Sequence, residues 1–236
     1  VGDLGRGISL NAPSGDAITL QLTSNLSRLD VTPDGITVGL STRFDGSQSL
    51  VVAEAGTPLL PESALPVFDT NTVQAQVRLD VINQALTQLW RSGFFNLQDA
   101  GLVSSLGANL PDGAEVRLSL PYPPFVEGTE GSTTLTLNMG PLSASVQYPG
   151  FFEEPFALQL VAKLSASVSL EGERRLRFSG VNVESINLSL GSSVPAEARE
   201  RLESALTSIL QPLVDEALNN ALPSLPIPEF SIPDGL

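Results

Sequence analysis

Apolar and polar side chains alternate with a period of two through most of the chain, which is typical of strands with one buried face. Five runs follow this pattern, at residues 18–22, 36–44, 73–79, 116–120 and 135–139. The clearest run begins at Leu158 and ends at Leu170, with an apolar residue at every alternate position. At about 3.3 Å per residue it spans about 40 Å, roughly twice the usual strand length. We therefore expect long antiparallel strands.

The run from Arg175 to Leu190 is about as long, but its apolar positions change phase twice. The first shift follows Phe178, where Gly180 lies, and the second separates Val183 from Ile186. A shift of one residue indicates a β-bulge, which adds twist and curvature to a strand. Residues 171–173 are predicted to form a tight hairpin turn between the two runs. Strands this long and bulged form a sheet that must curl around something.

Two segments have a helical period instead. The first extends from Asp80 to Ser92, with Asp80 as the expected N-terminal cap and Gly93 as the residue that ends the helix. Its apolar side chains recur three and four residues apart, at Ile82, Ala85, Leu86, Leu89 and Trp90. This spacing predicts a helix with one buried face.

The second helical segment extends from Val194 to Leu222, and its apolar stripe is so wide that most of the helix must be covered. Ser193 is the expected cap, and Pro195 falls in the first turn, where its missing N–H has no effect. Pro212 is expected to kink the helix. Its polar positions mark a narrow exposed strip, at Arg199, Glu203, Asp215 and Asn219.

Prolines and glycines mark the connecting segments. Residues 56–66 are expected to form a linker, and residues 121–131 a loop. In residues 223–233 apolar residues alternate with prolines, which indicates an extended edge segment packed on an apolar surface. The pattern predicts an α+β fold, with a long antiparallel sheet, a long C-terminal helix and a shorter second helix, in one domain over residues 1–236.

Composition agrees with a globular chain that has a large core. Of its 236 residues, 42% are hydrophobic and only 16% charged, and the mean hydropathy is +0.15. No apolar run approaches the roughly 20 residues of a membrane-spanning helix. The first residues lack a basic and an apolar region, so we expect that any targeting signal has been removed or lies upstream.

The net charge of −14, from 26 acidic and 12 basic residues, limits the partners. So acidic a surface repels phosphate, which excludes nucleic acid as an expected partner and disfavours polybasic docking on an anionic membrane. The densest basic cluster, at residues 173–177, contains glutamate as well and is interpreted as a solvated turn.

The chain contains neither histidine nor cysteine, which excludes the commonest catalytic chemistries. Ser-His-Asp and Cys-His hydrolysis, thiolate metal sites and histidine-ligated zinc are all impossible. Adjacent acidic pairs at residues 153–154 and 215–216 are interpreted as ordinary surface, and no phosphate-binding or nucleophile motif is present. We expect no enzyme, no cofactor and no metal.

The first helical segment and the end of the chain resemble the bactericidal/permeability-increasing protein-like family of the tubular lipid-binding (TULIP) superfamily. The order of elements agrees over residues 30–236. The resembling stretch begins at Phe68-Asp69-Thr70, and the residue-level match is confined to Asn83-Gln84-Ala85-Leu86, Leu89-Trp90, Gly93-Phe94 and the proline-rich tail from Pro223 to Pro228.

The resemblance implies a highly twisted antiparallel sheet wrapped around the long C-terminal helix, with the acyl chains of a lipid between sheet and helices. It implies binding, and transport, of an acyl-chain or sterol-like lipid, with transient membrane contact. Members from animals carry a disulfide that this chain lacks, and those that neutralise endotoxin use a basic tip, so endotoxin binding is not carried over. The missing cysteine favours a bacterial member, periplasmic, in the cell envelope or secreted. Many members have two domains, which leaves open a second tandem domain, a longer two-domain protein or a homodimer.

The candidate lipid-binding residues are the apolar positions of both helices and of the longest strand: Ile82, Leu86, Leu89, Trp90, Leu160, Ala162, Leu164, Ala166, Leu206, Ile209, Leu210 and Leu213. The alternative is plain packing between sheet and helices, in a structural or interaction module of a larger envelope assembly that binds no lipid. A third class, a membrane-damaging protein, is disfavoured by the acidic charge. The phenylalanine pairs at residues 94–95 and 151–152 are either an entrance rim or buried anchors.

Overall fold

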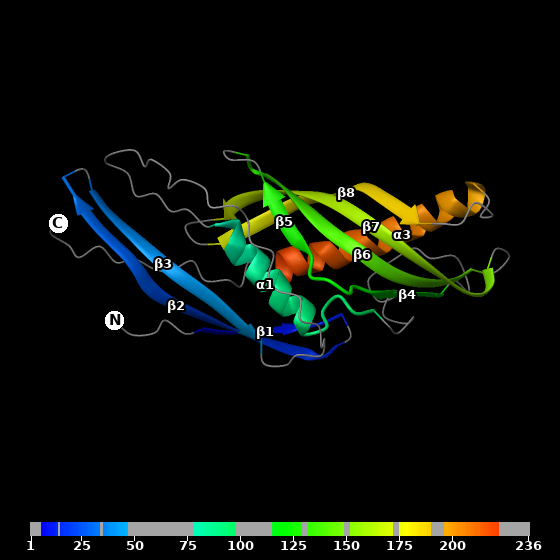
Figure 1. The fold of residues 1–236 in the computed structure, drawn as a ribbon, viewed down its shortest axis with the longest axis horizontal. Coiled ribbons are helices and arrows are strands. Elements are labelled where there is room, and N and C mark those ends of the chain that lie inside the picture. The colour runs from blue at the N-terminus through cyan, green and yellow to red at the C-terminus, as the bar shows by residue number, and fades with distance from the viewer. Residues whose placement is uncertain are drawn as a thin grey trace.

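The computed structural model describes residues 6–13, 15–33, 35–46, 78–97, 115–128, 132–148, 152–171, 175–189 and 196–221. They form an α+β fold, as the alternation of periods predicts (Figure 1). In chain order the elements are β1 (Arg6–Asn11), β2 (Ala17–Thr32), β3 (Gly35–Gly46), α1 (Leu79–Arg91), β4 (Glu115–Ser119), β5 (Phe125–Gly128), β6 (Thr134–Tyr148), β7 (Phe152–Glu171), β8 (Arg175–Ser189), α3 (Ala196–Glu216) and the π-helical turn η1 (Ala217–Ala221).

The described strands form two antiparallel sheets, whereas the sequence predicted one. β1, β2 and β3 form a three-stranded sheet in that order. The second sheet has the order β4-β6-β7-β8, and β5 also pairs with β6. The partners of β4 are residues 143–147 of β6 and those of β5 are residues 135–138, so these two short strands follow one another along a single edge. A period of two identifies strands but not their partners, which is why the division into two sheets was missed.

Several boundaries differ from those predicted. Residues 125–128 lie in the expected loop but form β5, which pairs with β6. The strand expected at residues 73–79 lies outside the described residues except for Arg78, which is the N-cap of α1, and Leu79, which begins this helix. The linker at 56–66 and the tail at 223–233 also lie outside them.

The long strands and the bulges are confirmed. β7 has 20 residues, and β6 and β8 have 15 each. The register of β7 against β8 shifts twice, once between Ser179 and Asn182 and once between Val183 and Ser185. Gly180 lies in the first shift with φ +65°, a backbone conformation that favours glycine. Glu171 pairs with Arg175, so β7 and β8 form a hairpin whose turn lies outside the described residues.

Helix α1 has the predicted buried face, but its start differs. The N-cap is Arg78, which makes no capping hydrogen bond through its side chain, and Asp80 lies inside the first turn with an ion pair to Arg78 at 2.7 Å. The end is as predicted, because Gly93 has φ +81°. The amide of Gly93 donates to the Trp90 carbonyl and that of Phe94 to the Leu89 carbonyl, which is the Schellman arrangement.

Helix α3 packs against β8 and lies along the five-stranded sheet (Figure 1). Its buried face is the predicted apolar stripe, from Ala198 to Val214, and η1 continues it through Ala217 and Leu218. Pro212 lies inside the helix, which continues beyond it to Glu216. The expected cap, Ser193, and Pro195 lie outside the described residues.

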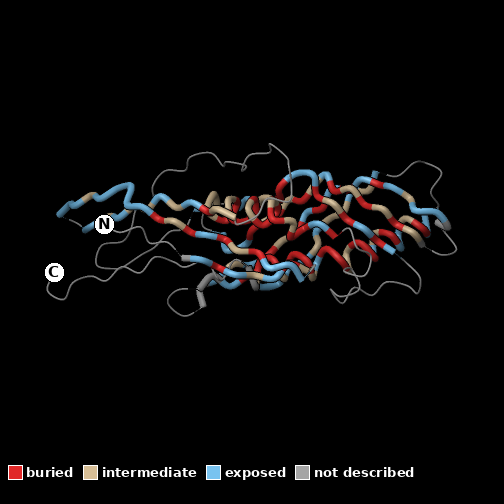
Figure 2. Tube along the Cα trace, turned by 90° about the horizontal axis from the view of Figure 1, so that it is seen from below, coloured by how far each residue is buried: buried red, intermediate tan, exposed pale blue. Residues whose placement is uncertain are grey.

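One apolar cluster of the described residues connects the two sheets. Ile8, Leu20 and Phe44 of the smaller sheet belong to the same cluster of buried side chains as both helices and the five-stranded sheet. Helix α1 links them, because it packs on β3 on one side and on β5 on the other. Figure 2 shows the buried residues concentrated in this body, while the far half of the β2–β3 hairpin is mostly exposed. None of the described helices is both long and apolar enough to cross a membrane.

Candidate functional site

The predicted lipid-binding residues lie in one continuous layer of apolar side chains, which we call the apolar layer. It includes residues of α1, of β7 and of α3, and all of them belong to the same buried cluster. None is more than 5% exposed: Ile82, Leu86, Leu89, Trp90, Leu160, Ala162, Leu164, Ala166, Leu206, Ile209, Leu210 and Leu213. The structure therefore brings together residues more than one hundred positions apart in the chain.

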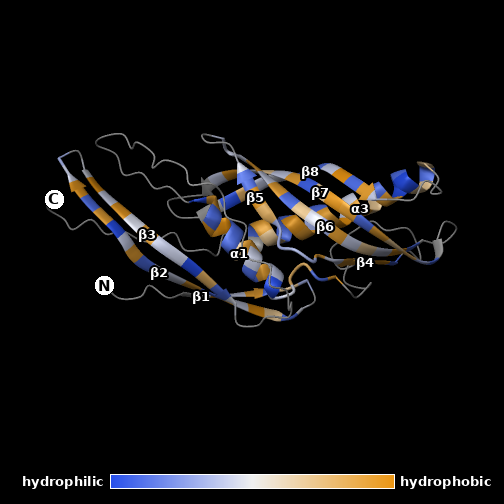
Figure 3. Ribbon diagram, viewed as in Figure 1, coloured by the Kyte–Doolittle hydropathy of each residue, from blue (hydrophilic) through white to orange (hydrophobic). Residues whose placement is uncertain are grey.

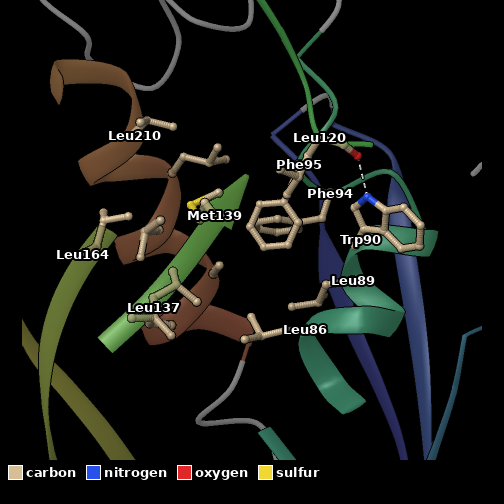
Figure 4. Packing of buried hydrophobic residues seen from close by; sticks show 14 of the residues in the cluster. Leu86, Leu89, Trp90, Phe94, Phe95, Leu120, Leu137, Met139, Leu164 and Leu210 are labelled. Atoms are coloured by element: carbon tan, nitrogen blue, oxygen red, sulfur yellow. Dashed lines mark hydrogen bonds between the residues drawn. The ribbon is translucent and has the colours of Figure 1, made fainter. Parts of the chain in front are cut away.

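The two helices lie on different strands and direct their side chains into the same region. α1 packs on β3 and β5, whereas α3 packs on β8. Figure 4 shows Leu86 and Leu89 of α1 pointing toward the side of β6 and α3, where Met139 and Leu210 lie. β6 thus supplies part of the layer that the prediction did not include, through buried residues such as Leu137 and Met139.

Small side chains on the inner face of β7 give the layer its shape. Ala162 and Ala166 are buried and alternate with Leu160 and Leu164. A methyl group fills far less space than a leucine side chain, so the surface of β7 is lower at the alanines. Such positions either let a neighbouring element approach closely or leave room for an apolar ligand.

A pair of polar contacts fixes α1 to the edge of the sheet formed by β4 and β5. Val126 donates its backbone N–H to Asn83 Oδ1 at 2.7 Å, and Asn83 Nδ2 donates to the Val126 carbonyl at 3.1 Å. The side chain of Asn83 thus takes the place of a neighbouring strand. Trp90 Nε1 donates to the Leu120 carbonyl at 2.5 Å, just before the break between β4 and β5. The contacts of Asn83 and Trp90 thus attach α1 to β5 and to the residue that follows β4.

The role of Asn83 was not predicted, although the residue belongs to the motif that carries the family resemblance. A signal for it exists in the sequence. Asn83 and Thr87 are polar, lie four residues apart and border the apolar stripe of α1, so they fall on the buried side of the helix. Both are fully buried, and Thr87 Oγ1 donates to the Asn83 carbonyl at 2.8 Å.

The phenylalanines at 94 and 95 are buried anchors, so their interpretation as an entrance rim is wrong. Each is 2% exposed, and their rings meet edge to face with centroids 5.2 Å apart. The peptide that follows is held by paired hydrogen bonds between Leu97 and Leu118. The side chains at 151 and 152 lie outside the described residues.

The apolar layer carries no charge. Among the described residues the buried polar side chains are Ser24, Asn83, Thr87 and Ser92, and every buried side-chain nitrogen or oxygen has a hydrogen-bond partner. The described part of the chain also holds no group of three acidic residues placed to bind a metal ion. What the described residues of this layer offer chemically is apolar contact.

The fold and the layer define the class of the molecule: an α+β protein in which, among the described elements, α1, α3 and a long antiparallel sheet enclose a neutral apolar interior. Models of protein families give no match to this chain, and curated proteins give none either.

Proposed function

We propose that the apolar layer binds a lipid, of acyl-chain or sterol-like type, and that the protein carries this lipid between membranes. The observation that carries the proposal is the convergence of α1, α3 and β7 on one neutral layer in which small side chains alternate with large ones. The resemblance of α1 to the bactericidal/permeability-increasing protein-like family supports the same assignment.

The physical basis is transfer of apolar surface out of water. Each methylene group that leaves water contributes about 0.8 kcal/mol, so a long acyl chain gains on the order of 10 kcal/mol before ordering costs. The neutral lining suits the hydrocarbon part of a lipid and leaves a polar headgroup at the surface. With no histidine and no cysteine in the chain, we propose a carrier and not an enzyme, in the cell envelope or secreted.

A matched pair of substitutions on β7 tests the proposal. Ala162→Phe places an aromatic ring in the apolar layer. Val161→Phe places the same ring one residue earlier in β7, on the opposite face of the strand, where Val161 is 42% exposed. The readout is the fluorescence of Trp90, the only tryptophan, during titration with a bromine-labelled fatty acid.

We expect saturable quenching in the wild type and in Val161→Phe, and at least tenfold weaker binding in Ala162→Phe, because the ring takes the space of the ligand. Thermal unfolding shows whether each variant is folded. If neither the wild type nor Val161→Phe binds the acid, the layer is a packed core and the protein is a structural module.

A further inference from the structure

The outer part of the β2–β3 hairpin extends beyond the body of the protein (Figures 1 and 2). The last residue of β2 that pairs with β1 is Leu22, so from Thr23 onward β2 pairs with β3 alone among the described strands. We call residues 24–33 and 35–42 the outer hairpin. Within the described residues it is a two-stranded ribbon with both edges open.

One face of the outer hairpin is apolar from Leu26 and Leu40 to its outer end. Leu26 pairs with Leu40, Leu29 with Val38 and Val31 with Ile36, and paired residues lie on the same face. On the side of the body, the hydrogen-bonded pair of Ser24 and Thr42 separates these residues from Leu22 and Phe44, which belong to the buried core. Figure 3 shows the apolar positions recurring out to the end of the hairpin.

A β-bulge keeps this face continuous. The pairing shifts between Leu26 and Arg28, so β2 has one residue more than β3 at this point. Without that extra residue, Leu29 and Val31 would lie on the face opposite to Leu26, because side chains alternate strictly along a regular strand. The ribbon therefore keeps its apolar residues on one side even where the body no longer covers them.

The apolar face of the outer hairpin is exposed in the monomer. Its side chains are among the most exposed large hydrophobic residues of the described chain, with Val31 71%, Leu29 57% and Ile36 56% exposed. A two-stranded ribbon is marginally stable alone, and an exposed apolar patch of a few hundred Å² marks an interaction site. We therefore interpret this face as a surface that binds a partner.

A bilayer fits this ribbon poorly. Its open edges carry backbone N–H and C=O groups that would lose their water in hydrocarbon, at several kcal/mol each. The opposite face is polar, with Asn25, Arg28 and Asp30. The chain also carries a net charge of −14, which repels an anionic membrane surface.

A second copy of the chain fits better, because the face is regular and free of net charge. The charged residues of the outer hairpin are Arg28 and Asp30, so the hairpin is neutral in a chain of net charge −14. Arg28 pairs with Asp30 within its own strand. Two copies that meet through their outer hairpins keep their acidic bodies apart. Around a two-fold axis the apolar face of one copy packs on the same face of the other copy.

We propose that the protein forms a homodimer in which the apolar faces of two outer hairpins pack against each other. Two ribbons of about 30 Å bury on the order of 1,000 Å² in total, at the low end for specific interfaces. We therefore expect a dimer that dissociates on dilution. The proposal does not depend on the lipid proposed above.

The test is sedimentation velocity of the wild type, Val31→Glu and Val161→Glu over a wide concentration range. Both substitutions replace an exposed valine in a strand, one on the outer hairpin and one on β7. We expect dimers for the wild type and Val161→Glu, and a dissociation constant raised at least tenfold for Val31→Glu. A wild type that stays monomeric, or a dimer that Val31→Glu leaves intact, overturns the proposal.

Two further measurements separate this partner from others. Because the chain has no cysteine, Leu29→Cys introduces a single thiol in the middle pair of the apolar face, where the two-fold axis brings the two copies together. It should form an intermolecular disulfide under mild oxidation, while Val161→Cys should not. Equal crosslinking of both variants contradicts the proposed face. Wild-type protein that floats with phosphatidylcholine vesicles, and loses this property in Val31→Glu, would assign the hairpin to a membrane instead.

Discussion

Asn83 shows how one polar side chain positions the apolar layer. It is fully buried, and its amide group makes both a donor and an acceptor contact with the backbone of Val126. Among the described strands β5 pairs with β6 alone, through its other edge, so this contact gives hydrogen-bond partners to the backbone of Val126 on the edge that faces α1. The orientation of α1, and with it that of Leu86 and Leu89, depends on this contact.

Asn83→Ala is expected to lower the free energy of unfolding by about 2–3 kcal/mol, because the backbone N–H and C=O of Val126 lose their partners while buried. Chemical denaturation measures the change. Gln84→Ala is the control, since Gln84 is the next residue of α1 and is only partly buried. We expect a change within about 0.5 kcal/mol there. Equal losses in the two variants would contradict the role given to Asn83.

At the scale of the element, β-bulges determine which face the side chains of the long strands occupy and how strongly these strands twist. Those in β8 follow the phase shifts of the sequence, and the one in β2 keeps the apolar face of the outer hairpin continuous. Each adds one residue to one strand of a pair, which increases local twist. The curvature of the five-stranded sheet over α3 is thus encoded in the positions of Gly180 and its neighbours.

Gly180→Ala tests the first bulge of β8. Nothing lies within 4 Å of a methyl group added there, so the expected loss of about 1 kcal/mol comes only from the left-handed backbone, φ +65°. Gly7→Ala in β1 is the control, because its added methyl group also meets nothing within 4 Å. There the stability should stay the same or rise slightly. Thermal unfolding of both variants gives the comparison, and similar losses would contradict the assignment.

Elements with a regular apolar period were predictable from sequence, and those formed by long-range pairing were not. The strands at residues 158–170 and 175–190 and both helices follow from their period alone. β5 was missed because four residues next to several prolines have no period of their own, and they become a strand by pairing with β6. The exposure of the outer hairpin could not be predicted from the sequence either. Alternation identifies the apolar face of a strand, but not which part of this face other elements cover.

At the scale of the whole molecule, the sequence predicted that the candidate residues of both helices and of β7 come together, but not that β6 contributes to the same layer. The twelve candidate residues converge in the apolar layer, although α1, β7 and α3 are far apart in the chain. Residues of β6 such as Met139 join them, and no local pattern distinguishes these from any other buried strand. A lipid-binding interior and a packed core have the same side chains, so the distinction has to be measured.

The central proposal, a lipid carried in the apolar layer, is tested most directly by native mass spectrometry of the purified protein, followed by solvent extraction. We expect a species heavier than the chain by the mass of one lipid, and an extract that contains this lipid in near-equimolar amount. A protein of the bare chain mass that takes up neither fluorescent fatty acids nor sterols would contradict the account.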